Sequence, residues 1–507
     1  MQDVKSLPVS KEGHNAAFFF VLWQELQDSM RKYENMVNYR HADAEEGATM
    51  AKMKRAERIT DMTVGNPLKL ILIFMLPIMG GTMLQQFYSL VDAVVIGRVE
   101  GVTALAAVST SGWLDWTVLG IALGLTQGCS ILISQHFGAK DERALKHTVG
   151  QSIVLSVLTG VVLTLLAQIL IIPVLKVMNS PDETLPLSRI YLRVLFSGFP
   201  MVMGYNLTAS FLRALGDSRT PLIAMGIASG LNIALDLLFV AVFRMGVMGA
   251  ALATVIAQSI SFVYNLVALR KLKLVHPQRR DLIPDRKVLW HLFKLGFPMA
   301  MASAVISIGA MLLQTVINGF GIVFMAGASA AGRLTGITEV AGSALGAGMA
   351  TYMGQNIGAG KLDRVRQGMR KGAQLGFGLG VFMAALLFIF GRGLMRLFVE
   401  DDPLLVEQVL RIGCQYLYVM AAFMPSLYLL FVYRSSLQGL GETVIPMYSG
   451  FMELFMRVVM LLILPRFIDH WGVYFAEVSA WFGAMVLLMW GYYRHVRRLN
   501  VKMEAKG

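Results

Sequence analysis

A chain of 507 residues that is 56% hydrophobic and only 15% charged, with a mean hydropathy of +0.60, is too apolar for a soluble fold. These values are typical of helical membrane proteins with many spans. The net charge of +13 does not indicate nucleic acid, because basic residues in this class gather on cytoplasmic loops near anionic lipid. Cys129 and Cys414 lie in apolar runs without metal-ligand neighbours, so no disulfide framework or zinc site is predicted.

Residues 1–66 differ from the rest of the chain, since they hold nine Lys and Arg and ten Asp and Glu. Their one apolar patch, 16–23, is too short to span a membrane and lacks the charged start and cleavage site of a secretory signal. We expect a cytoplasmic tail that is amphipathic or partly disordered. The alternative is that translation begins at Met50 or Met53.

Twelve apolar runs of about 20 residues or more follow, each long enough to cross a hydrocarbon core of about 30 Å. They cover approximately residues 68–97, 104–133, 149–175, 191–212, 221–242, 247–269, 288–317, 323–353, 372–390, 409–433, 446–464 and 473–493. The expected fold class is therefore an all-α polytopic membrane protein with twelve transmembrane helices.

The first apolar run carries Pro77 near its middle and Asp92 further along. An ionised carboxylate at membrane depth costs roughly 2.5 to 3.5 kcal/mol, so such residues usually belong to an ion or substrate path. Proline in a helix removes a backbone donor and clashes with the preceding turn, so Pro77 marks a place where this helix can bend. A bend beside a titratable group suits an ion-driven switch.

Basic residues are distributed unequally over the connections. With the N-terminus inside, the cytoplasmic connections hold 18 Lys and Arg, Arg434 among them, against nine on the opposite side. By the positive-inside rule both termini are predicted to be cytoplasmic.

The chain is internally repeated. SQHFGAKDERALK (134–146) returns as GQNIGAGKLDRVRQ (354–367), LRALGDSRTP (212–221) returns as LQGLGETVIP (437–446), and Pro77 returns as Pro298. The repeat predicts two six-helix lobes, 67–270 and 288–494, joined by a cytoplasmic linker, 271–287, and followed by a tail, 495–507. Because six is even, the two lobes are parallel repeats related by a pseudo-two-fold axis along the membrane normal.

The repeat also serves as an internal control, because a polar residue found in one lobe alone is not required by the fold. Asp92 corresponds to Leu313, Asp236 to Leu461 and Asn232 to Arg457. Tyr88 lies one turn before Asp92, and Thr254 supplies another hydroxyl. The five residues predicted to form a cation-coupling site are Tyr88, Asp92, Asn232, Asp236 and Thr254.

These side chains offer oxygen atoms, which hard cations prefer, so Asp92, Asp236 and Asn232 could ligate Na⁺. A proton could use the same site, because burial and like charge favour a neutral carboxyl. The sequence does not decide between the two ions. The alternative interpretation is that each acid has a local hydrogen-bond partner.

Other polar residues lie at membrane depth, Asp115 in the first lobe and the rest in the second. Glu453 and Arg457 are four residues apart, which suits a structural ion pair within one helix. The roles of Glu339, Arg333 and Asp115 stay open between substrate contact and satisfied polar group. On the second helix, Gly120, Gly124 and Gly128 follow at four-residue spacing and predict close helix packing.

The motifs resemble those of the multidrug and toxic compound extrusion family. The resemblance runs from about residue 66 to 498 and rests on LVDAVVIGRVEGVTALAAVS (90–109), the two repeated connections, LRALGDSRTP and LNIALDLLF (231–239). It implies two six-helix lobes that export organic cations and other amphiphiles in exchange for protons or sodium. Asp92 resembles the family's helix-1 carboxylate, and Pro77 the proline at which that helix bends.

The resemblance also implies that Tyr88, Asn232, Asp236 and Thr254 complete a first-lobe cation site. Gln85 and Asn206 correspond to substrate contacts in the cavity. Ile306 stands where one branch of the family has a glutamate, which favours coupling through the first lobe.

The function predicted is therefore secondary active efflux of lipophilic, often cationic compounds by a monomer in the plasma (inner) membrane. No enzyme is expected, since the chain has no HExxH or GxSxG motif, and no cofactor besides the coupling ion H⁺ or Na⁺. The alternative on the same fold is a flippase for a lipid-linked saccharide, for which only Arg333 and Arg457 offer basic contacts. A passive channel is disfavoured because no filter-like loop is present.

Overall fold

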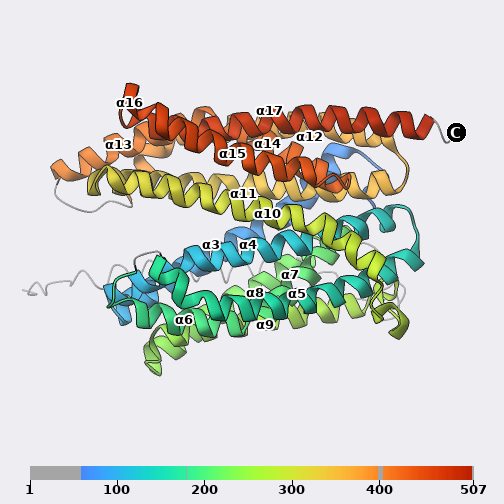
Figure 1. Ribbon diagram of the computed structural model, residues 1–507, viewed down its shortest axis with the longest axis horizontal. Helices are drawn as coiled ribbons and strands as arrows, with labels where there is room; N and C mark the ends of the chain where they lie inside the picture. Colours follow the sequence, from blue (N-terminus) through green and yellow to red (C-terminus); the bar gives the residue numbers. More distant parts are fainter. Residues whose placement is uncertain (1–58, 178–179, 398–402, 505–507) are drawn as a thin grey trace, which may run out of the picture. The chain divides into compact units, whose positions relative to one another are not determined.

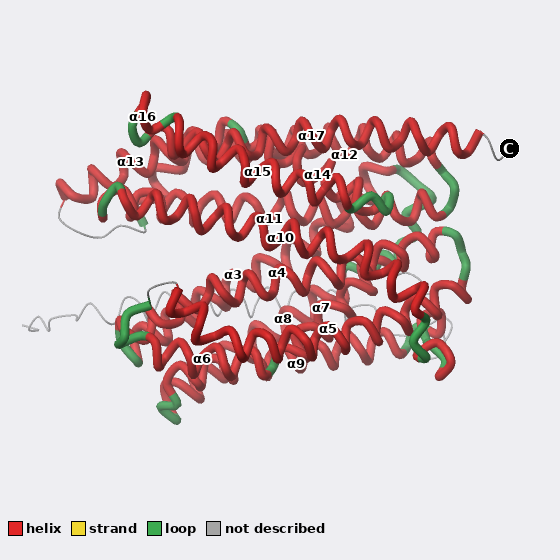
Figure 2. Tube along the Cα trace, viewed as in Figure 1, coloured by secondary structure: helices red, strands yellow, loops and turns green. Residues whose placement is uncertain are grey.

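The computed structural model describes residues 59–177, 180–397 and 403–504, which are nearly all helical and include no strand (Figure 2). The patch 16–23, the alternative starts Met50 and Met53, and the last three residues of the predicted C-terminal tail lie outside the described residues.

The helices follow the predicted runs closely. The first lobe contains α3 (Pro67–Val99), α4 (Val102–Gly138), α5 (Glu142–Val177), α6 (Leu185–Ser197), α7 (Phe199–Ala214), α8 (Arg219–Asp236), the π-helical turn η1 (Leu237–Val242) and α9 (Gly246–Arg270). Two 3₁₀ turns, η2 (Lys273–Val275) and η3 (Arg279–Leu282), form the linker. The second lobe contains α10 (Arg286–Gly319), α11 (Ile322–Gly358), α12 (Leu362–Arg396), α13 (Pro403–Ala422), α14 (Met424–Gly439), α15 (Val444–Ile463), α16 (Pro465–Ile468) and α17 (Trp471–Glu504).

Twelve predicted spans are accounted for by these helices. Within the described residues, eight helices are individually long and apolar enough to cross a membrane, and the pair α13 and α14, bent by 49°, makes a ninth. The remaining three are the broken pair α6 and α7, and the long helices α11 and α15, which carry charged side chains. In both broken spans a proline, Pro200 or Pro425, lies in the first turn after the break, where its missing N–H costs least.

The last helix is longer than the apolar run that predicts it. Helix α17 runs to Glu504 and so includes residues 495–504 of the predicted tail. The lobe boundaries at 67–270 and 288–494 stay predictions.

The repeated LG[DE] motif has the same local structure in both lobes. Gly216 and Gly441 have φ values of 90° and 84°, a region that favours glycine. Asp217 then accepts bonds from the N–H groups that begin α8, and Glu442 does so for α15. The His495 side chain and these N–H groups hold the pKa of Glu442 below its ordinary value.

Helices α3 and α10 each pass from one lobe to the other (Figure 1). The first half of α3 packs its Ile71 and Phe74 into the core of the second lobe, whereas its last turns join the core of the first. Helix α10 does the reverse, with Leu292 in the first lobe and Leu313 in the second. Each lobe therefore holds the beginning of the other lobe's first helix.

Glycines allow α4 and α10 to approach closely. A Cβ atom on Gly124 would overlap the backbone of Ala300, and one on Gly128 would overlap that of Gly296. The prediction that these glycines serve packing is confirmed, and the contact joins the two lobes.

The lobes also exchange hydrogen bonds at the end where the linker lies. The Gln135 side chain donates to the Gly439 carbonyl at 3.1 Å, and the Gln355 side chain donates to the Ala214 carbonyl at 3.0 Å. The two glutamines occupy equivalent positions of the repeated connection. The same bond thus occurs twice, in opposite directions, and closes this end.

Residues 60–65, just before α3, join this closed end. Met62 is fully buried, donates its N–H to Gln355 at 2.8 Å and accepts bonds from the side chains of Asn356 and Arg364. The last part of the predicted N-terminal tail therefore belongs to the fold.

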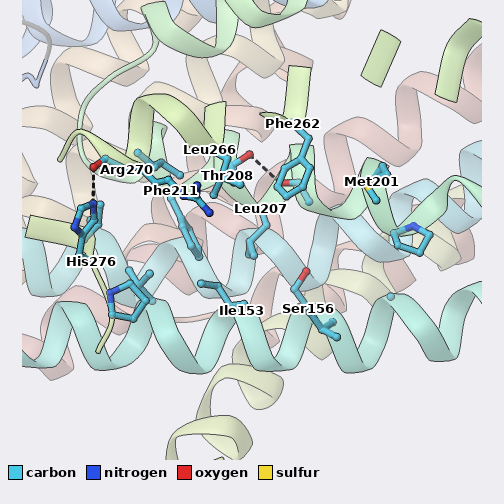
Figure 3. Close-up of a pocket in the computed structure, with 18 of the residues that line it drawn as sticks. Ile153, Ser156, Met201, Leu207, Thr208, Phe211, Phe262, Leu266, Arg270 and His276 are labelled. Carbon is cyan, nitrogen blue, oxygen red and sulfur yellow. Dashed lines mark hydrogen bonds between the residues drawn. The ribbon is translucent and has the colours of Figure 1, made fainter. Parts of the chain in front are cut away.

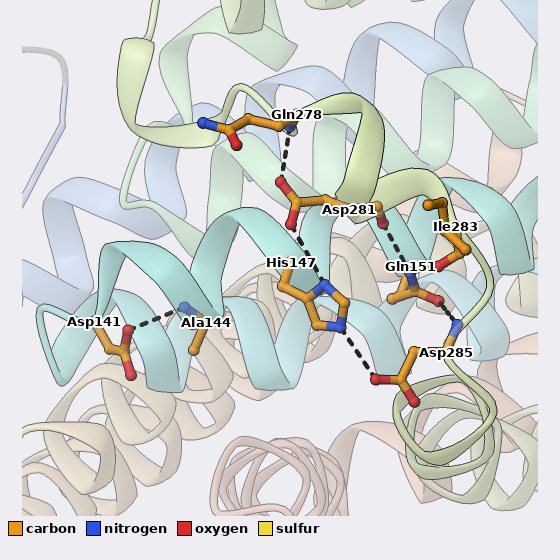
Figure 4. A network of polar contacts seen from close by, with 8 residues as sticks. All are labelled: Asp141, Ala144, His147, Gln151, Gln278, Asp281, Ile283 and Asp285. Carbon is orange, nitrogen blue, oxygen red and sulfur yellow. Dashed lines mark hydrogen bonds and ion pairs between the residues drawn. The ribbon is translucent and has the colours of Figure 1, made fainter.

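The linker makes the corresponding contact with the first lobe (Figure 4). The Gln151 side chain donates to the carbonyls of Asp281 and Ile283, both at 2.7 Å, and accepts from the Asp285 N–H at 2.8 Å. His147 lies between the carboxylates of Asp281 and Asp285 at 3.5 and 3.4 Å. Each segment that precedes a crossing helix is thus tied to the opposite lobe.

Replacing Gly128 by alanine is expected to lower the free energy of unfolding of the purified protein by about 1 to 3 kcal/mol, because the new methyl group overpacks the α4–α10 contact. Gly112→Ala is the matched control on the same helix, because a Cβ atom at Gly112 meets no atom within 4 Å. This variant should raise the free energy of unfolding by up to about 1 kcal/mol, since alanine favours a helix more than glycine does. Equal unfolding temperatures for the two variants would contradict this packing.

Candidate functional site

The predicted cation site forms where α3, α8 and α9 pack against one another. Asp92 comes from α3, Asn232 and Asp236 lie one turn apart on α8, and Thr254 comes from α9. The exposed fractions are 8% for Asp92, 1% for Asn232 and 0% for Asp236. Both carboxyl groups are thus buried on helices that pack directly against each other. The structure therefore brings these residues together.

The site has more acceptors than donors. Asp92 Oδ1, Asn232 Oδ1 and both carboxyl oxygens of Asp236 are buried without a hydrogen-bond partner among the described residues. The Asn232 amide donates to Thr254 Oγ1 at 3.4 Å. A buried polar group without a partner costs about 1 to 3 kcal/mol, so four such oxygens in one place destabilise the fold. Their arrangement suits the binding of a cation or a proton.

An apolar frame surrounds these oxygens. Tyr88 packs with Met225, Ala228 and Ala257 from α8 and α9, which shields the site from solvent. The described residues contain no group of three or more His, Cys, Asp and Glu side chains placed to hold a metal ion. A metal ion here would therefore use two carboxylates and neutral oxygens.

The π-helical turn η1 begins directly after Asp236. Such turns are rare and recur at functional sites, because the wider turn interrupts the regular backbone bonding of the helix. The residues from 237 to 242, LLFVAV, carry no signal for this turn, so the sequence did not predict it.

Pro77 and Gln85 lie in a separate small cavity of about 80 Å³ between α3, α7 and α8. Tyr205 and Arg213 also line it, whereas Asp92 and Asp236 do not. Asn206 is not part of its lining, and its amide donates to the Val202 carbonyl of its own helix at 2.9 Å. The structure thus groups Gln85 with the proposed hinge but leaves Asn206 apart.

The second lobe holds a buried cluster of balanced charge. Arg457 on α15 forms two bonds to the carboxylate of Glu477 on α17, at 2.8 and 2.7 Å. Glu453 pairs with Arg434 on α14 and lies 3.7 Å from Arg457. Two arginines and two glutamates therefore neutralise one another in the core.

This cluster confirms one sequence-based interpretation and corrects another. The predicted ion pair of Glu453 and Arg457 is present at 3.7 Å, and both residues also make shorter contacts to other helices. Arg434, assigned to a connection, lies within α14 with a side chain only 14% exposed. Glu477 was overlooked, although an acid inside the last apolar run is the same signal that singled out Asp92.

Glu339, Asp115 and Arg333, whose roles the sequence leaves open, make fewer polar contacts than the buried cluster. Glu339 and Asp115 are half-buried, Arg333 is exposed, and none of them forms an ion pair within the described part of the chain. Whether these three side chains contact substrate stays a prediction.

An all-helical membrane protein of two repeated lobes, with a buried acidic pocket in one of them, is by class a polytopic transporter. The chain belongs to the MatE family, whose model matches residues 77–238 and 298–463, one segment in each lobe. The predicted membership of the multidrug and toxic compound extrusion transporters is confirmed, and the protein is not an enzyme.

Relatives agree with this assignment. The chain is 34% identical over 385 residues to "Probable multidrug resistance protein YpnP" of Bacillus subtilis, covering 75% of this chain and 84% of that protein. It is 30% identical over 437 residues to "Probable multidrug resistance protein YoeA" of the same organism, covering 84% and 93%. A MOP superfamily transporter from Pyrococcus furiosus has the same fold, with a TM-score of 0.81, 24% identity and coverage of 87% and 98%.

Arg457→Met is expected to destabilise the purified protein by about 3 to 5 kcal/mol, because it leaves Glu477 buried without its partner. The double variant Arg457→Met, Glu477→Met should recover much of this loss in thermal unfolding. Arg392→Met is the control, since its pair with Glu407 is 62% exposed on both sides and is worth at most about 1 kcal/mol. A stable Arg457→Met single variant would contradict a structural role for the cluster.

Proposed function

We propose that the protein is a secondary active antiporter that exports lipophilic, often cationic compounds in exchange for H⁺ or Na⁺. The observation that supports this most directly is the group of four unpartnered oxygens at Asp92, Asn232 and Asp236. A proton or sodium ion entering this pocket relieves the repulsion between two carboxylates and satisfies oxygens that have no donor. In this proposal the coupling ion is the partner of the unpaired oxygens of Asp92, Asn232 and Asp236 in the first lobe.

The coupling mechanism uses the crossing helix α3. Asp92 lies in its first-lobe half, while Ile71 and Phe74 hold its beginning in the second lobe. Pro77 lies between these two parts, where the helix can bend. Ion binding at Asp92 then changes the preferred curvature of α3 and, with it, the space available for a substrate.

The free energy needed to drive export is modest. A membrane potential provides about 2.3 kcal/mol per charge per 100 mV, and a ligand shifts a conformational equilibrium only by its differential affinity for the two states. A substrate pocket that exists only while Asp92 and Asp236 are ionised meets this condition, because neutralisation by the coupling ion then releases the substrate. We further propose that the transporter is a plasma-membrane monomer with both termini cytoplasmic.

The flippase alternative is not favoured. A pyrophosphate carrier needs several free basic groups in its cleft, but Arg457 is already neutralised by Glu477 and Glu453. Only Arg333 is left of the two candidates.

Dye efflux from vesicles under separately imposed proton and sodium gradients tests the proposal. Wild-type efflux should need one of the gradients, and Asp92→Asn and Asp236→Asn should reduce it to background because the site can no longer alternate between charged and neutral. Neither variant should lower the unfolding temperature, since each removes a buried charge without a partner.

Asp182→Asn is the control for this assay, as it changes an exposed acid of the same lobe and should leave efflux intact. Full efflux by Asp92→Asn would refute the proposed site, and efflux without either gradient would refute antiport.

The double variant Gln135→Ala, Gln355→Ala is expected to open the linker end more often. Each bond contributes about 0.5 to 1.5 kcal/mol, so losing both shifts the equilibrium toward the open form by about 30-fold. Spin labels at Arg143 and Asp363, exposed in the first turns of α5 and α12, should report a new longer distance.

Gln367→Ala, an exposed glutamine on α12, is the control and should keep the original distance. An unchanged distance in the double variant would show that the two glutamines do not hold this end closed.

A further inference from the structure

An apolar groove of about 540 Å³ lies on the first lobe (Figure 3), and neither Asp92 nor Asp236 lines it. Helix α5 contributes Ile153 and Val157, α7 contributes Leu207 and Phe211, and α9 contributes Phe262. Because these helices span the membrane, the groove is accessible to lipid rather than to a soluble ligand.

The interior of the groove is mainly apolar. Its hydroxyl groups are those of Ser156 and Thr208, and Thr208 donates to the Gly204 carbonyl of its own helix at 2.8 Å. The long side chains of the walls are aliphatic or aromatic. A hydrocarbon chain is the kind of occupant that such a surface stabilises, at about 25 cal/mol per Å² of buried apolar area.

One end of the groove is basic. Arg270 and His276 line it, with the His276 ring 2.6 Å from the Arg270 carbonyl. The Arg270 side chain is exposed and has no carboxylate partner in the part of the chain that the structure describes. From 270 to 287 the chain has seven Lys and Arg against two Asp, and both aspartates already contact His147.

We propose that this groove binds an anionic phospholipid, with an acyl chain along α5, α7 and α9 and the headgroup at Arg270. Charge complementarity selects the headgroup, because each basic residue near an anionic lipid surface contributes about 1 kcal/mol. A zwitterionic lipid supplies the same chain without the net negative charge. The groove shares no lining residue with the candidate cation site.

The position of the groove gives the lipid a structural role. Val275, His276 and Pro277 of the linker close its end, and the linker is tied to α5 through Gln151 and leads into α10. An occupied groove therefore holds the linker against the first lobe, where the crossing helix α10 begins.

Native mass spectrometry of the purified protein, titrated with phosphatidylglycerol or phosphatidylcholine, tests the proposal. Phosphatidylglycerol should be retained preferentially by the wild type. Arg270→Gln should lower this retention about fivefold, whereas Arg286→Gln, which removes the same charge at the start of α10 outside the groove lining, should not. A matched loss in both variants would overturn the site.

A second pair of variants tests the hydrocarbon part. Val157 and Leu158 are neighbours on α5 with exposed fractions of 62% and 60%, but only Val157 lines the groove. Val157→Trp should fill it and abolish retention, and Leu158→Trp should not. Equal retention of both lipids by the wild type, binding of glycerol phosphate without an acyl chain, or full retention by Val157→Trp would each overturn the proposal.

Discussion

Two reciprocal hydrogen bonds, from Gln135 to Gly439 and from Gln355 to Ala214, are the constraint on which the arrangement of the lobes depends. They lie at the closed end of the molecule, where Gly138 and Gly358 leave no space for a side chain between α4 and α11. A backbone approach of this kind is possible only with glycine, so the contact is specific but depends on a few weak bonds. A contact of a few kcal/mol is strong enough to populate one state and weak enough to be reversed by ligand binding.

The two lobes share a scaffold but differ in charge. Where the first lobe has Asp236 and Asn232 without donors, the second has Leu461 and Arg457, and its acids Glu453 and Glu477 are neutralised by arginines. A balanced cluster has little to gain from an additional cation, whereas an unbalanced pair of carboxylates does. The duplication thus separates the requirement of the fold, which both lobes meet, from the proposed coupling, which only one lobe can provide.

Much of this architecture could be predicted from the sequence, because spans of apolar residues and repeated motifs are local signals. The pairing of Asp92 with Asp236 also followed, since the repeat identified which acids the scaffold does not need. Local signals fail where a contact is made over a long separation in the sequence. Met62 is an ordinary residue in a polar segment, and only the fold places it beside Gln355. Arg434 looked like a loop residue because its partner, Glu453, lies on another helix.

The crossing of α3 is the structural basis of the coupling that we propose between the first-lobe pocket and the closed end. Its beginning follows residues 60–65, which bind Gln355 and Arg364 of the second lobe, and its later turns carry Asp92 in the first. A straight helix would make these two attachments rigid with respect to each other, but Pro77 interrupts the backbone bonding between them. In the proposed mechanism, a change of charge at Asp92 acts on a helix whose beginning is held at the closed end by residues 60–65. The equivalent helix α10 has Pro298 but no acid in place of Asp92, so the proposal assigns the ion-dependent bending to α3 alone.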